Sequence, residues 1–220
     1  MTSVLNSFDI VTTALAVALL LCAVWGSSKF RQGQMVRYFA LQSMFLALLL
    51  GSLAFHGDQH LYLNAVCVLI FKAMLIPVII TSSAKRSYTS GRLISLVSSA
   101  GSYFVFGVAL GVAVMAARAI APAVSDVNLI LICLAFAIML IGSVTMMVRR
   151  DPYSQIIAFF TLGNGITLLA TATLGAIPLL AELGIDLTVT LGVLLMSLLA
   201  RRLKELYAVE DTGELRELIG

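Results

Sequence analysis

A lysine, Lys72, stands near the middle of an apolar stretch that is long enough to cross a lipid bilayer as a helix. The stretch runs from Leu61 to Thr81, and its other strongly polar residue is Asn64. A bilayer-spanning helix needs about 20 residues. An ammonium group at mid-bilayer costs about 2.5–3.5 kcal/mol, so it faces a partner, a water-filled cavity or the interior of a bundle. Lys72 therefore either handles protons or ions, or pairs with a neighbouring helix and only fixes the packing.

Pro77 follows Lys72 within the same stretch. Proline cannot donate a backbone hydrogen bond, so it leaves a carbonyl about one turn earlier, near Ala73, free for a side chain or water. A charge beside a loosened helical turn favours a role in ion or proton handling.

The composition predicts an all-α, polytopic membrane protein. Hydrophobic residues make up 60% of the 220 residues and charged residues 11%, whereas soluble domains carry about 25% charged residues. Backbone groups in lipid must be paired internally, so the spans are helices. Seven spans are expected, at residues 4–26, 35–55, 61–82, 93–117, 125–148, 154–175 and 179–203.

The placement of the basic residues predicts the topology. Twelve of the fourteen Lys and Arg residues fall on one side under a seven-helix count, while Arg118 falls on the other side and Lys72 lies in the membrane. Basic connections stay in the cytoplasm. The N-terminus is therefore expected outside and the C-terminus in the cytoplasm, with a short acidic-basic tail at 206–220.

Two segments that each follow a basic connection resemble one another weakly. Residues 34–50 (QMVRYFALQSMFLALLL) and 155–171 (QIIAFFTLGNGITLLAT) both enter the membrane with aromatic residues and then carry polar ones. This echo predicts that the first three and last three spans form a parallel repeat.

Several polar residues inside the spans are candidates for a proton pathway besides Lys72 and Asn64. Gln42 and Asn164 are amides that either bind neighbouring helices or belong to a proton wire. In the last span Glu182 and Asp186 are four residues apart and share a helix face. Thr188 continues inward, where a hydroxyl bonds back to its helix or relays through water.

The sequence carries no phosphate-binding glycine loop, nucleophile–base pair or metal-ligand spacing. Its second half nevertheless resembles a known family. The runs RRDPYSQIIAFFTLGNGITLL and ELGIDLTVTLGVLLMSLLARRLKEL, followed by the tail VEDTGELRELIG, resemble the K subunit of respiratory complex I. The whole chain is similar to the component E family of hydrogenase-4 and formate hydrogenlyase complexes. The similarity includes Phe71–Pro77, the Asn164-Gly165 pair and Leu198–Arg201.

The resemblance implies a non-catalytic subunit of a complex I-like group 4 [NiFe]-hydrogenase in a bacterial inner membrane. It divides the chain into a four-helix part (1–118), a K-subunit-like three-helix part (119–205) and the cytoplasmic tail (206–220). The implied partners are antiporter-like and complex I-like membrane subunits and a cytoplasmic hydrogenase arm. That arm would hold the nickel-iron centre and the iron–sulfur clusters, and this chain would hold no cofactor.

The chain departs from the family at two positions. The family carries a membrane glutamate where this chain has Gly163, and an acidic residue where it has Thr188. Lys72 matches the family and becomes the main ionisable candidate for proton translocation.

Two other functions fit the sequence less well. A stand-alone small secondary transporter would work without partners, but the sequence shows no broken helix apart from Pro77. The other is a seven-helix receptor or retinal protein, in which a Schiff-base lysine belongs inside the last span, and this chain has no lysine there before Lys204.

Overall fold

The computed structural model describes residues 7–29, 31–55, 60–87, 99–120, 128–149 and 151–174 of the chain. It also describes four positions further on, namely Gly184, Leu191, Gly192 and Leu195. The seventh span expected at 179–203 and the tail at 206–220 thus fall almost entirely outside the described residues.

The described residues form seven α-helices and one π-helical segment, and none of them forms a β-strand. These are α1 (Ser7–Ser27), α2 (Gln32–Ala54), α3 (His60–Cys67), η1 (Val68–Leu75), α4 (Ile76–Ser87), α5 (Ser99–Ile120), α6 (Leu129–Val148) and α7 (Pro152–Leu174). Because α3, η1 and α4 follow one another without a break, they make a single span. Among the described residues six helices are long and apolar enough to cross a membrane, so the chain is a multi-pass membrane protein whose described spans are all helical.

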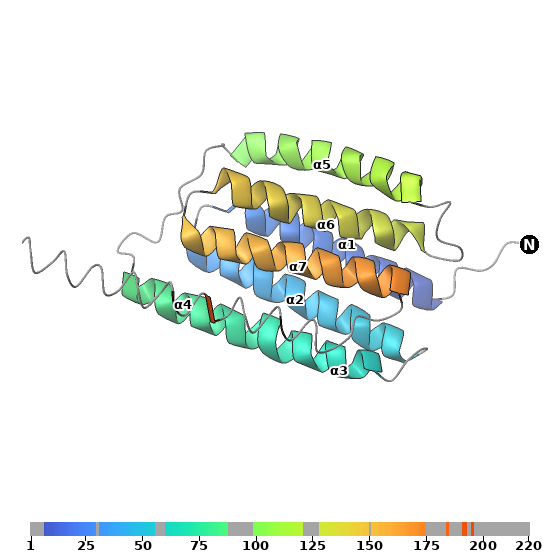
Figure 1. Cartoon of the computed structure of the whole chain (residues 1–220), viewed down its shortest axis with the longest axis horizontal. Helices are drawn as coiled ribbons and strands as arrows, with labels where there is room; N and C mark the ends of the chain where they lie inside the picture. Colours follow the sequence, from blue (N-terminus) through green and yellow to red (C-terminus); the bar gives the residue numbers. More distant parts are fainter. Residues whose placement is uncertain are drawn as a thin grey trace, which may run out of the picture.

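The helices lie roughly side by side in one bundle (Figure 1). Helix α6 packs on α7, α5 and α1, while α2 packs on α1, α7 and the α3–η1–α4 span. Contacts therefore cross the boundary expected after Arg118, because α6 and α7 pack directly on helices of the first part. Helix α5 lies at one edge of the bundle and the α3–η1–α4 span at the opposite edge.

The tightest crossing joins α6 and α7 through two glycines. A Cβ atom added to Gly142 would lie 2.7 Å from the Leu162 nitrogen, and one added to Gly165 would lie 2.8 Å from the Met139 nitrogen. Real Cβ atoms do not approach backbone this closely. Each glycine therefore lets one helix backbone rest on the other, which is how small residues hold helices together in lipid.

The backbone before Pro77 is π-helical from Val68 to Leu75. The Ile76 amide donates to the carbonyl of Phe71, five residues earlier, instead of four residues earlier as in an α-helix. The loosened turn that the sequence predicts near Ala73 is thus a widened segment of eight residues, and Lys72 lies within it. Such π segments occur frequently at functional sites.

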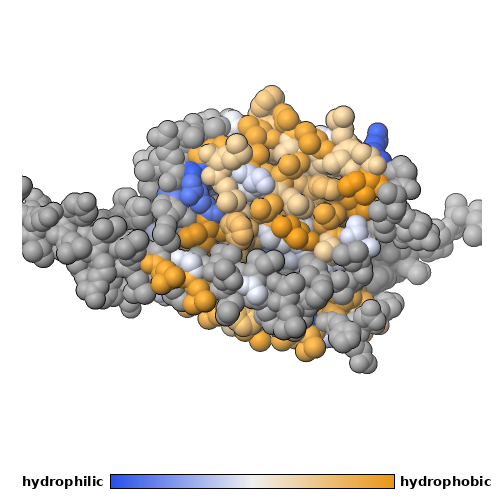
Figure 2. Space-filling view, viewed as in Figure 1, coloured by the Kyte–Doolittle hydropathy of each residue, from blue (hydrophilic) through white to orange (hydrophobic). Residues whose placement is uncertain are grey.

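One end of the bundle carries basic residues, and we call it the basic end. There α1 and α6 finish while α2 and α7 begin (Figure 1, left). The basic residues at this end include Lys29, Arg31, Arg37 and Arg149. Figure 2 shows hydrophilic atoms at this end, next to a broad apolar band over the middle of the bundle. Arg118, in the last turn of α5, lies at the opposite end, as the topology predicts.

Candidate functional site: a buried polar seam

Lys72 points into the bundle, not into the lipid. Its side chain is 2% exposed, and its Nζ atom donates to the hydroxyl of Thr167 on α7 over 3.5 Å. This is at the long end of hydrogen-bond distances. The expectation that the mid-membrane ammonium group faces protein is confirmed by this burial.

Helix α7 presents a row of buried polar side chains toward α2 and η1. Its members are Thr161, Asn164, Thr167 and Thr171, none more than 6% exposed. The spacings of three, three and four residues place them on one helix face. Each threonine also donates back to the carbonyl four residues earlier in α7, so its hydroxyl is already fixed in position.

Helix α2 meets this row with Gln42 and Ser43. The Thr161 hydroxyl contacts the Gln42 side-chain oxygen at 3.4 Å, and the Asn164 amide donates to the Ser43 hydroxyl at 3.1 Å. We call the set Gln42, Ser43, Thr161, Asn164, Thr167 and Lys72 the polar seam. It links α2, α7 and η1 through the buried middle of the bundle.

Two amide atoms of the polar seam have no hydrogen-bond partner although they are buried. They are the side-chain nitrogen of Gln42 and the side-chain oxygen of Asn164. Gln42 is 1% exposed and Asn164 is fully buried. A buried polar atom left unpaired costs about 1–3 kcal/mol, so the seam retains capacity to bind water or another polar group.

Helices α2 and α7 are parallel and meet through equivalent positions of the echo between 34–50 and 155–171. Phe39 and Phe160 occupy the same place in the two segments, and their ring centroids lie 5.7 Å apart. Ser43 and Asn164 are likewise equivalent and bind each other. Both contacts join equivalent positions of the two segments. The packing therefore agrees with the parallel orientation that the sequence echo predicts.

The second buried cation, Arg149, closes the basic end. It follows α6, is 3% exposed, and donates to the carbonyls of Ser27 and Lys29, each over 2.6 Å. Ser27 ends α1 and Lys29 lies just after it, so Arg149 ties the end of α1 and the start of the following connection to the α6–α7 connection. Burial lowers the pKa of the Arg149 guanidinium, and the nearby Asp151 carboxylate opposes this shift.

Asp151 directly precedes helix α7. One of its carboxylate oxygens accepts from the Ser154 amide over 2.8 Å, which is the usual N-cap interaction. Its negative charge also lies where the helix dipole favours an anion. The cap fixes the start of α7 at the basic end. It thereby also fixes the height of the polar row in the bundle.

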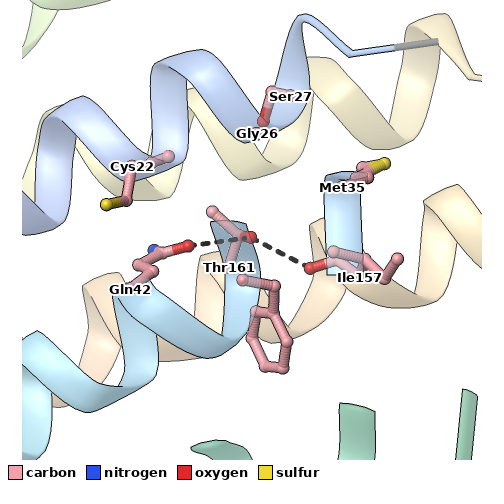
Figure 3. A pocket seen from close by; sticks show the side chains of 9 residues that line it. Cys22, Gly26, Ser27, Met35, Gln42, Ile157 and Thr161 are labelled. Atoms are coloured by element: carbon pink, nitrogen blue, oxygen red, sulfur yellow. Dashed lines mark hydrogen bonds between the residues drawn. The ribbon is translucent and has the colours of Figure 1, made fainter. Parts of the chain in front are cut away.

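A narrow crevice leads from the basic end toward the polar seam, between α1, α2 and α7. Its empty volume is about 170 Å³, including the open mouth. Ser27 and Met35 line it near the basic end, and Cys22, Gln42 and Thr161 line it deeper. In Figure 3 the Gln42 nitrogen turns toward α1 and Cys22, and its oxygen turns toward Thr161.

The structure brings together three of the residues that the sequence singles out. Lys72, Gln42 and Asn164 belong to the polar seam, and Asn64 is buried on α3, at 2% exposure. Glu182, Asp186 and Thr188 lie outside the described residues. Sequence reasoning missed Thr161 and Thr167, although their spacing around Asn164 on one helix face was a signal for them.

Among the described residues no group of three His, Cys, Asp or Glu side chains could hold a metal ion. The chemistry available in the seam is that of one lysine, two amides and several hydroxyls. These groups bind water and exchange hydrogen bonds, and the lysine alone among them ionises readily.

The chain is similar to a protein of a mycobacterium. The chain is 28% identical over 166 residues to an uncharacterized protein, Rv0085, of Mycobacterium tuberculosis (strain ATCC 25618 / H37Rv), and the match covers 74% of each chain. No family model and no solved structure matches the chain. The match runs over most of both chains, so the two proteins are similar over more than a single helix pair.

Proposed function

We propose that this chain is a non-catalytic membrane subunit of a complex I-like, group 4 [NiFe]-hydrogenase-type assembly. In this proposal it helps to build the membrane arm and takes part in proton translocation. The assembly would contain antiporter-like and complex I-like membrane subunits and a cytoplasmic arm that holds the metal centres. The sequence resemblance at Phe71–Pro77, Asn164-Gly165 and Leu198–Arg201 supports the membership.

The buried contact between Lys72 and Thr167 is the observation that carries the proton role. It places an ionisable group at mid-membrane, in a π-helical segment and against a row of hydroxyls. A protonated lysine is a donor only, and a neutral amine also accepts a hydrogen bond. A proton that leaves or joins Lys72 would therefore change the hydrogen bonding of the row on α7. Ionisable residues inside membranes mark proton relays and ion paths in general.

We also propose seven spans, with the N-terminus outside and the C-terminus in the cytoplasm of a bacterial inner membrane. The gathering of Lys29, Arg31, Arg37 and Arg149 at one end supports this orientation, since basic connections remain cytoplasmic. In this orientation the basic end would face the hydrogenase arm, and its charge would aid docking. A reporter that is active only in the cytoplasm should be active when it is fused after Gly220. Activity there of a reporter that works only outside the membrane would contradict the orientation.

Copurification tests the membership directly. The tagged chain, expressed from its own chromosomal locus and extracted in mild detergent, should elute with much larger membrane and iron–sulfur partners. Elution of the 23.5 kDa chain alone, with transport activity after reconstitution, would support a stand-alone transporter instead. Mass spectrometry of the eluted particle identifies the partners, and the same extraction without the tag controls for carry-over.

A further inference from the structure

The crevice between α1, α2 and α7 ends on a buried amide that is incompletely bonded. The Gln42 side chain is 1% exposed and its nitrogen lacks a hydrogen-bond acceptor. Its oxygen meets the Thr161 hydroxyl over 3.4 Å. A donor that is buried beside an open-ended crevice is a place where a water molecule lowers the free energy.

The same crevice reaches the basic end. Its lining passes from Ser27 and Met35 at that end to Cys22 and Gln42 deeper in the bundle (Figure 3). Gln42 follows Met35 by seven residues on α2, which is about 10 Å along a helix. In the observed arrangement the side chains leave no gap as wide as a water molecule. Met35 is flexible enough to change this, because an unbranched thioether side chain adapts its shape easily.

The polar groups continue from Gln42 to the buried lysine. Thr161 contacts Gln42, and Asn164 follows it on the same face with its own unpaired oxygen. Thr167 comes next and meets Lys72. The whole run from Thr161 to Thr167 covers about 9 Å of α7. A few water molecules would connect these groups, because the amide nitrogen donates to water and the amide oxygen accepts from it.

We propose that this crevice is a gated water path from the basic end to the polar seam, with Met35 as the gate. Water enters between α1 and α2, binds the Gln42 nitrogen and the Asn164 oxygen, and reaches the environment of Lys72. The path gives Lys72 proton exchange with one side of the membrane. This inference extends the proton role proposed above, but water access is measurable whether or not the chain belongs to a hydrogenase-type assembly.

Cys22 provides a probe for the path, because it lines the crevice and is 8% exposed. The test uses the full chain in its native membranes with Cys67→Ser and Cys133→Ser, so that Cys22 is the sole thiol. A charged, membrane-impermeant methanethiosulfonate reagent is added from the basic-end side or from the opposite side. The matched control is Leu21→Cys with Cys22→Ser, because Leu21 lies at the same depth but is 45% exposed on the outer surface of the bundle.

Cys22 should react from the basic-end side at least about tenfold faster than the Leu21→Cys thiol, since a thiolate forms in water and not in hydrocarbon. Met35→Ala should accelerate the reaction of Cys22 further, by about threefold or more, because it removes the flexible part of the gate. Labelling of Cys22 no faster than the control, or only from the opposite side, would overturn the path. An unchanged rate in Met35→Ala would overturn the gate.

If the chain copurifies as a hydrogenase-type particle but Cys22 stays unlabelled, the proposed function holds and the water path is wrong. If the chain elutes alone and Cys22 is labelled rapidly, the water path holds and the proposed function is wrong. The two failures are therefore distinguishable.

Discussion

Helix α7 has two buried faces that are built in opposite ways. The face toward α6 has Gly165, and with Gly142 it brings the two backbones into contact. The face toward α2 and η1 carries the polar row, in which Asn164 has an unpaired oxygen. A close glycine contact is favourable for packing, whereas an unpaired buried atom is unfavourable. Stability accounts for the first face, and the second retains polar groups that stability alone does not require.

Arg149 and Lys72, the buried cations among the described residues, also differ in how they are bonded. Arg149 lies at the end of the bundle and donates to two main-chain carbonyls over 2.6 Å each. Lys72 lies at mid-membrane, and its contact with Thr167 is 3.5 Å long. Short charge-assisted bonds to main-chain atoms indicate a structural clamp. The contact of Lys72 with a hydroxyl is longer and lies inside a π-helical segment, which agrees with the proton role proposed above.

The glycine face should give the largest loss of stability. Gly142→Ala places a methyl group against the backbone of Leu162 and Ala158, which cannot move without separating α6 from α7. We expect a loss of about 3 kcal/mol, at the upper end of ordinary overpacking. Thermal unfolding in detergent measures it.

Gly163→Ala is the matched control for that substitution. An added Cβ at Gly163 meets nothing within 4 Å, and alanine favours the helix by up to about 1 kcal/mol. Equal losses in the two variants would show that the α6–α7 contact is not specific to Gly142.

The clamp at the basic end should rank second. Arg149→Met removes the donor to the Ser27 and Lys29 carbonyls. Water at the membrane surface then forms some of the hydrogen bonds that these carbonyls lose. We expect a loss of about 2 kcal/mol, within the range for hydrogen bonds to charged groups. Arg31→Met, at an exposed residue of the same end, should change stability by less than about 0.5 kcal/mol. Similar melting temperatures for both variants would argue against the clamp.

Lys72→Met should alter activity more than stability. Methionine keeps much of the side-chain volume, and replacing a buried charge by an apolar side chain is often neutral or stabilising. We expect assembly to be retained with a change of about 1 kcal/mol or less, while proton-coupled turnover falls about tenfold or more, as for loss of a proton-transfer group. Assay of the purified complex in proteoliposomes measures turnover. Failed assembly would support the packing interpretation, and normal assembly with normal turnover would leave Lys72 without either role.

Asn164→Leu should have the smallest effect on stability. It removes the unpaired Asn164 oxygen but leaves the buried Ser43 hydroxyl without its donor, so gain and loss nearly cancel and the net change should stay within about 0.5 kcal/mol. A double-mutant cycle with Ser43→Ala isolates the bond, whose coupling should be about 0.6–2 kcal/mol, the range for interhelical hydrogen bonds in membranes. A loss above about 2 kcal/mol for Asn164→Leu alone would make the polar seam a packing device like the glycine face.

Six of the expected spans and the inward direction of Lys72 were predictable without a structure. Both follow from the cost of placing a polar group in hydrocarbon, and that cost depends on each residue and its near neighbours in the chain. That Pro77 disturbs the helix before it was predictable, but the length of the disturbed segment was not. A missing donor frees one carbonyl, yet the helix is widened from Val68 to Leu75, because neighbouring helices decide how a helix relaxes.

The partners of these residues depended on the packing of the helices. Thr167 lies 95 residues from Lys72, and Arg149 reaches carbonyls more than a hundred residues away. A periodic pattern tells which face of a helix is polar, but not which helix will lie against it. Rotation and crossing of the helices bring Gln42 to Thr161 and Gly142 to Leu162, and they arise from steric fit between backbones that one helix alone does not encode.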